Sequence, residues 1–281
     1  MGKWPILDKI EMADGPIDDK DYERELTKLQ HRLLDLQVYH LRTGGRVIIG
    51  IDGWDAAGKG GLIERIVGGL EPKSTQVWRI GAPTPQDQGR HYLWRFWDRL
   101  PAPGNWAIFD RTWYGRVLVE RIEGLCSVEA WKRAFREINE FERQLTDDGV
   151  CIVKILVHVS AEEQKQRMID RLEKPHKRYK VGLEDFRNIA KRQAYLEAYD
   201  DMLERTDTDH APWRLIATDN KQQARLAGLR IVAEEVGKGQ EVPQQSLDPG
   251  IADAAFRLWG WKPGNGKPHK DKKKKDNGDN T

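Results

Sequence analysis

Apolar residues along the chain follow two alternating patterns. Short runs of mostly consecutive apolar residues, typical of buried parallel strands, recur five times. The expected strands cover residues 48–51, 76–80, 106–110, 151–159 and 214–217. Between them lie segments in which apolar residues recur every three or four positions, which indicates amphipathic helices.

The first helical segment covers residues 18–41. Its apolar stripe consists of Tyr22, Leu26, Leu29, Leu33 and Leu36. Further helices are expected directly after the first strand, through residues 93–100, at 128–145 and at 222–236, and two helical segments without a strand occupy 160–208. Strands that alternate with helices in this way predict an α/β fold with a doubly wound parallel sheet.

The same pattern divides the chain into three regions. Residues 1–45 form an N-terminal lead-in and helix, and residues 46–240 form the core, with the strandless insert at about 160–208. Residues 241–281 form a C-terminal extension. From Gly264 this extension is rich in lysine, glycine and asparagine without apolar anchors, so we expect its end to be disordered.

Composition excludes several classes of function. The formal net charge of the 281 residues is only +2, so a field directed at nucleic acid is not indicated. No apolar run approaches membrane-spanning length, and no signal-peptide pattern opens the chain. Two cysteines, Cys126 and Cys151, cannot form a disulfide framework. We therefore expect a soluble, cytoplasmic protein without a nucleic-acid or membrane partner.

The most informative motif follows the first strand. The sequence Gly-Trp-Asp-Ala-Ala-Gly-Lys-Gly-Gly at residues 53–61 has the strand–loop–helix layout of a phosphate-binding loop. Glycines let the backbone amides approach an oligophosphate, and Lys59 adds a mobile positive charge. The candidate phosphate-binding residues are Gly53, Ala56, Ala57, Gly58, Lys59, Gly60 and Gly61. The alternative is a turn that only joins a strand to a helix.

The loop departs from the usual Walker A motif at one position. The Ser or Thr that normally follows the lysine and binds Mg²⁺ is replaced by Gly60. A hard cation such as Mg²⁺ prefers carboxylate oxygens, so Asp55 inside the loop is the expected substitute.

A second motif lies at the end of the third strand. The apolar run 106–109 ends in Asp110, as in a Walker B strand, and Arg111 follows. In an open parallel sheet, ligands bind outside the carboxyl ends of the strands, so Asp55, Lys59 and Asp110 are expected to converge there. Asp55 and Asp110 are thus the candidate Mg²⁺ ligands.

The strandless insert carries concentrated positive charge. Residues 171–180 contain five Lys or Arg side chains and one carboxylate. A helical lid at this place would bring cations onto a transferring phosphoryl group and exclude water. The alternative is an ordinary solvated helix face.

Taken in order, these motifs make the chain resemble the polyphosphate kinase 2 family over residues 18–236. Further resembling segments are 82–84, 92–97, 117–124, 211–213 and 219–221. The resemblance implies a P-loop kinase-like fold with a helical lid and Mg²⁺-dependent phosphoryl transfer between inorganic polyphosphate and a nucleotide. It also implies catalytic roles for Asp55, Lys59, Asp110 and Arg111. In the lid, it directs Arg167, Arg171, Lys177, Arg178 and Lys180 toward the polyphosphate.

Within the family, segments 53–55, 82–84 and 117–121 look most like the subgroup that phosphorylates AMP to ADP. Members of that subgroup often carry two fused domains, whereas this chain has room for one. Polyphosphate-dependent phosphorylation of ADP or GDP stays an alternative, as do an ATP-dependent kinase and a non-catalytic polyanion-binding module. Family members commonly form dimers or tetramers, so we expect a homo-oligomer.

Overall fold

The computed structural model describes residues 7, 10, 15, 17–243 and 247–262. Five strands form one sheet in the order β2-β3-β1-β4-β5, and every neighbouring pair is parallel. Their bounds are β1 Arg46–Gly53, β2 Thr75–Arg79, β3 Trp106–Asp110, β4 Val150–His158 and β5 Trp213–Ala217. The predicted α/β fold with a parallel sheet is therefore confirmed, and all five expected strands are present.

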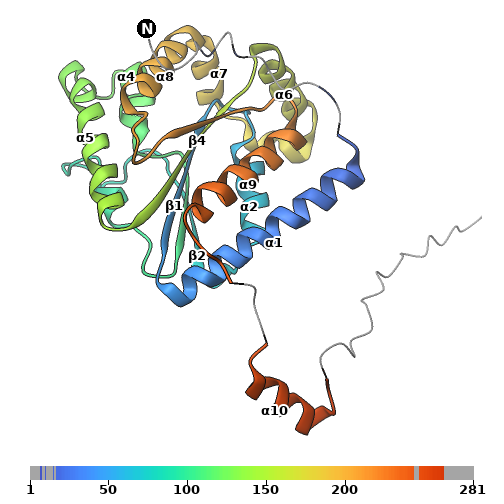
Figure 1. Cartoon of the computed structure of the whole chain (residues 1–281). Helices are drawn as coiled ribbons and strands as arrows, with labels where there is room; N and C mark the ends of the chain where they lie inside the picture. Colours follow the sequence, from blue (N-terminus) through green and yellow to red (C-terminus); the bar gives the residue numbers. More distant parts are fainter. Residues whose placement is uncertain (1–6, 8–9, 11–14, 16, 244–246, 263–281) are drawn as a thin grey trace, which may run out of the picture. The chain divides into compact units, whose positions relative to one another are not determined.

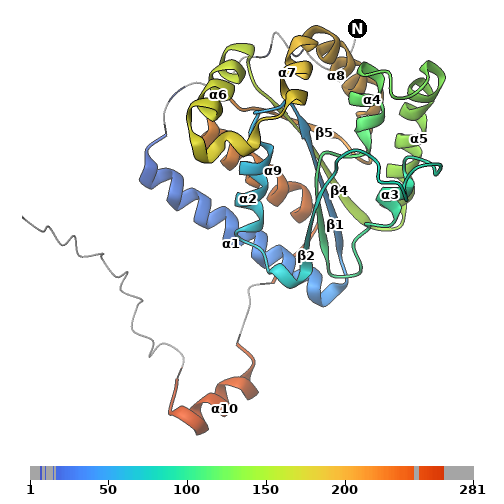
Figure 2. The same cartoon turned by 180° about the vertical axis from the view of Figure 1, so that it is seen from behind.

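Helices cover both faces of this sheet (Figure 1; Figure 2). One face carries α1 (Asp19–Thr43), α2 (Lys59–Val67) and α9 (Lys221–Gly237). The other carries α4 (Val119–Ile122), α5 (Val128–Asp147) and α8 (Arg192–Thr206). The strands β1 and β3 are buried from both sides, which explains why their sequences read as continuous apolar runs.

Helix α1 follows the predicted stripe. All five of the expected apolar residues are buried. The Asp18 side chain caps the first turn by accepting from the backbone N–H of Lys20 at 2.9 Å. Gly44 ends the helix with a φ of 79°, a left-handed conformation that glycine adopts at little cost.

Two expectations about helices need correction. The segment through residues 93–100 contains only a four-residue helix, α3 (Trp94–Trp97). The insert between β4 and β5 holds more than two helical segments: α6 (Ala161–Glu173), the 3₁₀ turn Pro175–Lys180, α7 (Leu183–Ala190) and α8. A proline disfavours helical backbone at the residue before it, so Pro175 explains why α6 ends before Lys174.

The chain divides into two compact units, residues 1–242 and 243–281. In the second unit, the described residues form α10 (Pro249–Trp259), a helix that the sequence pattern did not predict. The lysine-rich tail lies outside the described residues. None of the helices in the described ranges combines the length and apolar character that a membrane crossing needs.

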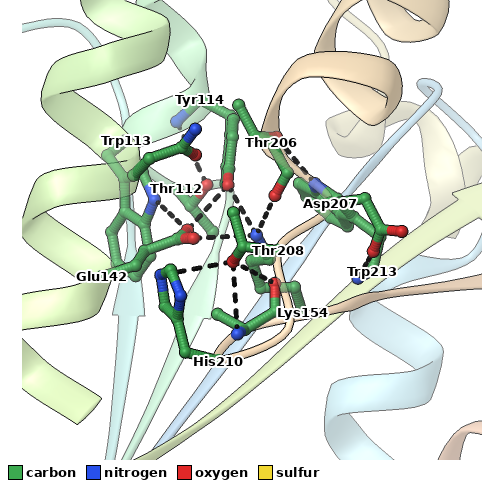
Figure 3. Close-up of polar contacts among 12 residues, drawn as sticks. Thr112, Trp113, Tyr114, Glu142, Lys154, Thr206, Asp207, Thr208, His210 and Trp213 are labelled. Atoms are coloured by element: carbon green, nitrogen blue, oxygen red, sulfur yellow. Dashed lines mark hydrogen bonds and ion pairs between the residues drawn. The ribbon is translucent and has the colours of Figure 1, made fainter. Parts of the chain in front are cut away.

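A buried polar network joins the sheet to the helices on one of its faces (Figure 3). Lys154 on β4 donates from Nζ to Glu142 Oε2 on α5 at 2.8 Å, to Tyr114 Oη at 2.9 Å and to the Thr206 carbonyl at 2.8 Å. Both charged side chains are at most 1% exposed. Trp113 and Tyr114 also donate to Glu142 Oε1. The network therefore ties the segment after β3 to the last turn of α8.

Candidate active site

The phosphate-binding loop connects β1 to α2 and its backbone requires small residues. Gly53 has a φ of 140°, and a Cβ there would lie 2.1 Å from the Val157 carbonyl oxygen. Gly58 has a φ of 102° at the N-cap of α2. Ala56 also adopts a positive φ, 62°, which is unusual for a residue with a side chain and marks local strain. The loop is therefore held in one conformation by its surroundings.

Lys59 folds back over this loop. Its Nζ donates to the carbonyls of Gly53 at 2.6 Å and Trp54 at 2.9 Å. Burial lowers the pKa of Lys59, an effect that the nearby Asp55 carboxylate opposes. The ammonium group thus sits above the loop where a phosphate could replace the two carbonyls as its partner.

Asp55 is held by side chains from two other parts of the chain. Its Oδ1 lies 3.3 Å from Arg111 Nη2, and its Oδ2 accepts from Asn188 Nδ2 at 2.7 Å. Burial raises the pKa of Asp55, but Lys59, the Asn188 hydrogen bond and Arg111 outweigh it, so the net shift is downward. The carboxylate is therefore ionised and oriented.

Asp110 lies at the carboxyl end of β3, opposite Ile51 of β1 and Arg79 of β2. Its half-buried carboxylate makes no hydrogen bond or ion pair with other described residues. Arg111 follows with a φ of 69°, and its backbone N–H donates to the Ile51 carbonyl at 3.0 Å. The left-handed backbone turns the half-exposed Arg111 side chain toward Asp55.

A cleft of about 810 Å³ contains all of these groups. It is lined by the predicted residues Asp55, Ala56, Ala57, Gly58, Lys59, Gly60, Gly61, Asp110, Arg111, Arg167, Arg171, Lys177 and Lys180. The remaining predicted loop residue, Gly53, is bonded to Lys59 beside them. The structure thus brings the loop, the β3 end and the lid together.

Two of the predicted lid residues make hydrogen bonds to the protein's own backbone. Arg167 is 5% exposed, and its guanidinium donates to the carbonyls of Ala56, Thr218 and Asp219 and pairs with Glu163. It therefore braces the loop from α6 instead of projecting freely. The exposed Arg178 donates to the Leu172 carbonyl at 2.8 Å, and it does not belong to the described residues that line the cleft.

Several residues of the site have no counterpart in the predicted motifs. Besides Asn188, Gln164 on α6 donates to the Asp55 carbonyl at 2.8 Å. Arg192 at the start of α8 donates to Gln164 Oε1 at 2.7 Å and stacks over the Trp54 ring at 4.2 Å. Asp52, buried at the end of β1, accepts from Thr112 Oγ1 at 2.5 Å. These contacts join the lid helices and the segment after β3 to the loop.

The carboxylates suit a hard cation. No group of three or more His, Cys, Asp or Glu side chains that could hold a metal ion occurs among the residues described. However, Mg²⁺ at phosphate sites commonly uses one or two carboxylates and takes its other ligands from substrate phosphates and water. The Asp110 carboxylate, without a hydrogen bond or ion pair to any described residue, and the oriented Asp55 carboxylate lie in one cleft and fit that mode of binding.

Comparisons with known proteins agree with this arrangement. Residues 16–244 match the family model of polyphosphate kinase 2. A polyphosphate:AMP phosphotransferase of Pseudomonas syringae is 43% identical over 83% of this chain and 47% of that protein. An ADP-polyphosphate phosphotransferase of Pseudomonas aeruginosa is 38% identical over 83% of this chain and 77% of that protein.

A crystal structure of polyphosphate kinase 2 from Arthrobacter aurescens superposes with a TM-score of 0.82 at 29% identity, covering 92% of this chain and 94% of that one. The chain spans about half the length of the polyphosphate:AMP phosphotransferases that it matches. The family model covers most of the chain, and the fold and loop agree with it. The chain therefore belongs to the polyphosphate kinase 2 family.

Proposed function

We propose that this protein transfers the terminal phosphoryl group of inorganic polyphosphate to a nucleotide, with AMP as the preferred acceptor. The observation that carries the proposal is the cleft. In it, the phosphate-binding loop, which has Gly60 where a Ser or Thr usually stands, meets two carboxylates and a cationic lid. Relatives named polyphosphate:AMP phosphotransferase at 41–43% identity support AMP as acceptor. ADP is the second candidate, because a relative named ADP-polyphosphate phosphotransferase is only slightly less similar, at 38% identity.

Each residue of the cleft has a distinct part in this proposal. Phosphoryl transfer depends on positioning and on neutralising the phosphate oxygens, so no protein nucleophile is required. Lys59 exchanges its bonds to two loop carbonyls for phosphate oxygens, and the amides of Gly58 to Gly61 at the start of α2 bind the same group. Arg111, which lies beside Asp55, neutralises the group in transfer.

The proposed cofactor is Mg²⁺, held by Asp55 and Asp110. When bound, the ion would supply positive charge that neutralises phosphate oxygens during transfer. Asp55 is ready for this part because Asn188 and Arg111 fix its orientation. The lid cations Arg171, Lys177 and Lys180 border the cleft and would bind the donor while excluding water.

Nucleotide turnover by chromatography tests this proposal. With Mg²⁺ and polyphosphate, AMP and ADP are supplied in separate reactions, and we expect ADP from AMP with little ATP from ADP. Rapid ATP formation from ADP would reassign the acceptor. Activity with ATP but not polyphosphate as donor would instead make the protein an ATP-dependent kinase, and binding without turnover would make it a polyanion-binding module.

The oligomeric state and the cellular location of the protein are separate proposals. We propose a cytoplasmic homo-oligomer, because family members commonly associate and a nucleotide kinase needs a nucleotide pool. Light scattering after size-exclusion chromatography measures the mass in solution, and a mass of about 32 kDa would contradict the oligomer.

A further inference from the structure

The cations around the cleft differ in whether they already pair with carboxylates or carbonyls of the protein itself. The Arg167 guanidinium donates to three backbone carbonyls and pairs with Glu163. Lys177 pairs with Asp170 at 2.6 Å, and Lys174 pairs with the same carboxylate at 2.5 Å. Part of the positive charge that the sequence places in the lid is therefore already neutralised.

Two cations on α9 are in a different position. Lys221 and Arg225 both line the cleft, one turn apart, and neither makes a hydrogen bond or ion pair with any other residue described. Lys221 is exposed and Arg225 is half-buried. Burial and the nearby Arg167 cation lower the pKa of Lys221, and Lys177 adds to the effect, whereas the Glu163 and Asp170 carboxylates oppose it. Lys221 and Arg225 thus face the cleft without an ion-pair partner among the described residues.

The phosphate loop leads directly to this pair. α9 packs closely beside α2, since a Cβ on Gly228 would lie 2.4 Å from Leu62 Cδ1. A Cβ on Gly61 would lie 3.2 Å from Arg225 Nη2, so the guanidinium stands next to the first turn of α2. A Cβ on Gly60 would meet nothing within 4 Å, so the space beside Gly60, which also lines the cleft, is open.

The position of Lys221 and Arg225 in the fold shows on which side of the phosphate loop they lie. α9 follows β5, the strand at one end of the sheet, whereas the exposed Arg79 ends β2 at the other. Lys221 also lies within electrostatic range of Arg167 and Lys177 of the lid. The lid and α9 therefore border the same side of the loop, and Arg79 stands on the side of Asp110.

We infer that Lys221 and Arg225 form a subsite for the donor, which binds polyphosphate units beyond those held by the loop. The inference rests on the proposed function. A chain of phosphates carries a negative charge at each unit, and recognition of such a polymer needs a row of cations instead of a shaped pocket. Donors long enough to pass from the loop over Gly60 and Gly61 to α9 gain these contacts, and short donors do not. The subsite thus makes the enzyme selective for long donors.

The test compares two donors and four proteins. The proteins are the wild type, Lys221→Ala/Arg225→Ala, the conservative Lys221→Arg/Arg225→Lys, and Arg230→Ala as a control on the same helix. Arg230 is exposed, pairs with Glu25 at 3.4 Å and lies outside the cleft lining. The KM and kcat for long-chain polyphosphate and for tripolyphosphate are measured, and binding of both to the nucleotide-free protein is followed by titration calorimetry.

For the double alanine variant, we expect the ratio of the long-chain KM to the tripolyphosphate KM to rise about tenfold. Two partly exposed charge contacts account for a change of that order. The conservative variant should restore most of the ratio, and Arg230→Ala should match the wild type. An equal change for both donors, or none, would overturn the subsite. If the wild type turned over no polyphosphate, the proposed function would fail, while the titration would still decide whether α9 binds the polymer.

Discussion

At the scale of single residues, Asn188 makes the most informative contact, because it joins the lid to the loop across 133 sequence positions. Its Nδ2 binds Asp55 Oδ2, and its Oδ1 accepts from Tyr195 Oη at 3.2 Å. Asn188→Leu keeps the volume and removes this bond. Loss of a hydrogen bond to a charged group costs about 1.5–3 kcal/mol, so we expect kcat/KM to fall by roughly 10- to 100-fold. Steady-state kinetics at several Mg²⁺ concentrations measure the change.

A control separates orientation of Asp55 from general damage to the lid. Arg187→Ala changes an exposed residue of the same helix that is not among the described residues lining the cleft; its side chain pairs with Glu123 at 3.5 Å and with Glu184 at 3.8 Å. The melting temperature of Arg187→Ala should stay close to that of the wild type, and that of Asn188→Leu should fall by only several degrees, so that both variants are folded in the assay. Unchanged kcat/KM in Asn188→Leu would show that the bond to Asp55 has no part in the reaction.

Cys151 offers a prediction about pH. Burial raises the pKa of its thiol to about 11, with the Glu235 carboxylate adding to the effect. Only the thiolate reacts with alkylating agents, and at pH 8 a thiol of this pKa is about one-thousandth ionised. We expect alkylation of Cys151 in the native protein to be slow at pH 8 and to quicken about tenfold per pH unit up to about pH 11. Mass spectrometry of Cys126→Ala protein follows the site alone, and fast labelling at pH 8 would refute the shift.

At the scale of elements, the β1–α2 connection shows that glycines in one loop have different reasons to be there. Gly53→Ala places a methyl group 2.1 Å from a backbone oxygen at a φ of 140°, so we expect a loss of about 2–4 kcal/mol in the free energy of unfolding. Gly60→Ala meets open space at the start of a helix, and its effect should stay below about 1 kcal/mol. Urea unfolding compares the two, and equal stability of the variants would contradict this distinction.

The elements that the sequence predicts well are those with a local signal. The strands β1 and β4 read as apolar runs because both of their faces are covered, and α1 has a regular stripe and a cap. The helix predicted through residues 93–100 is present only in part, because only four residues, Trp94 to Trp97, are helical. α10 was not predicted, because residues 241–281 were interpreted as one extension without a helix or strand.

The residues of the site likewise divide into those that a local sequence signal predicts and those that it does not. Lys59 and Asp55 lie within one contiguous loop, and Asp110 ends a strand parallel to β1, so local motifs and sheet topology suffice to bring them together. Asn188 and Arg192 lie on helices, where single polar residues give no periodic signal, and their contacts with the loop depend on how the lid packs. Charge alone also does not show how Arg167 is held, because the sequence does not tell which cations hydrogen-bond to the protein's own carbonyls.

At the scale of the whole molecule, the buried Lys154–Glu142 pair binds the layers together (Figure 3). Lys154→Met leaves a buried carboxylate without its cation, and Glu142→Gln leaves a buried ammonium group without its anion, so each should cost about 3–5 kcal/mol. The double variant leaves no unpaired charge, and its loss should lie nearer to one single variant than to the sum. Urea unfolding of the four proteins gives the coupling energy. Additive losses would mean that the neutral partners Tyr114 and Thr206, and not the ion pair, stabilise this junction between α5, β4 and α8.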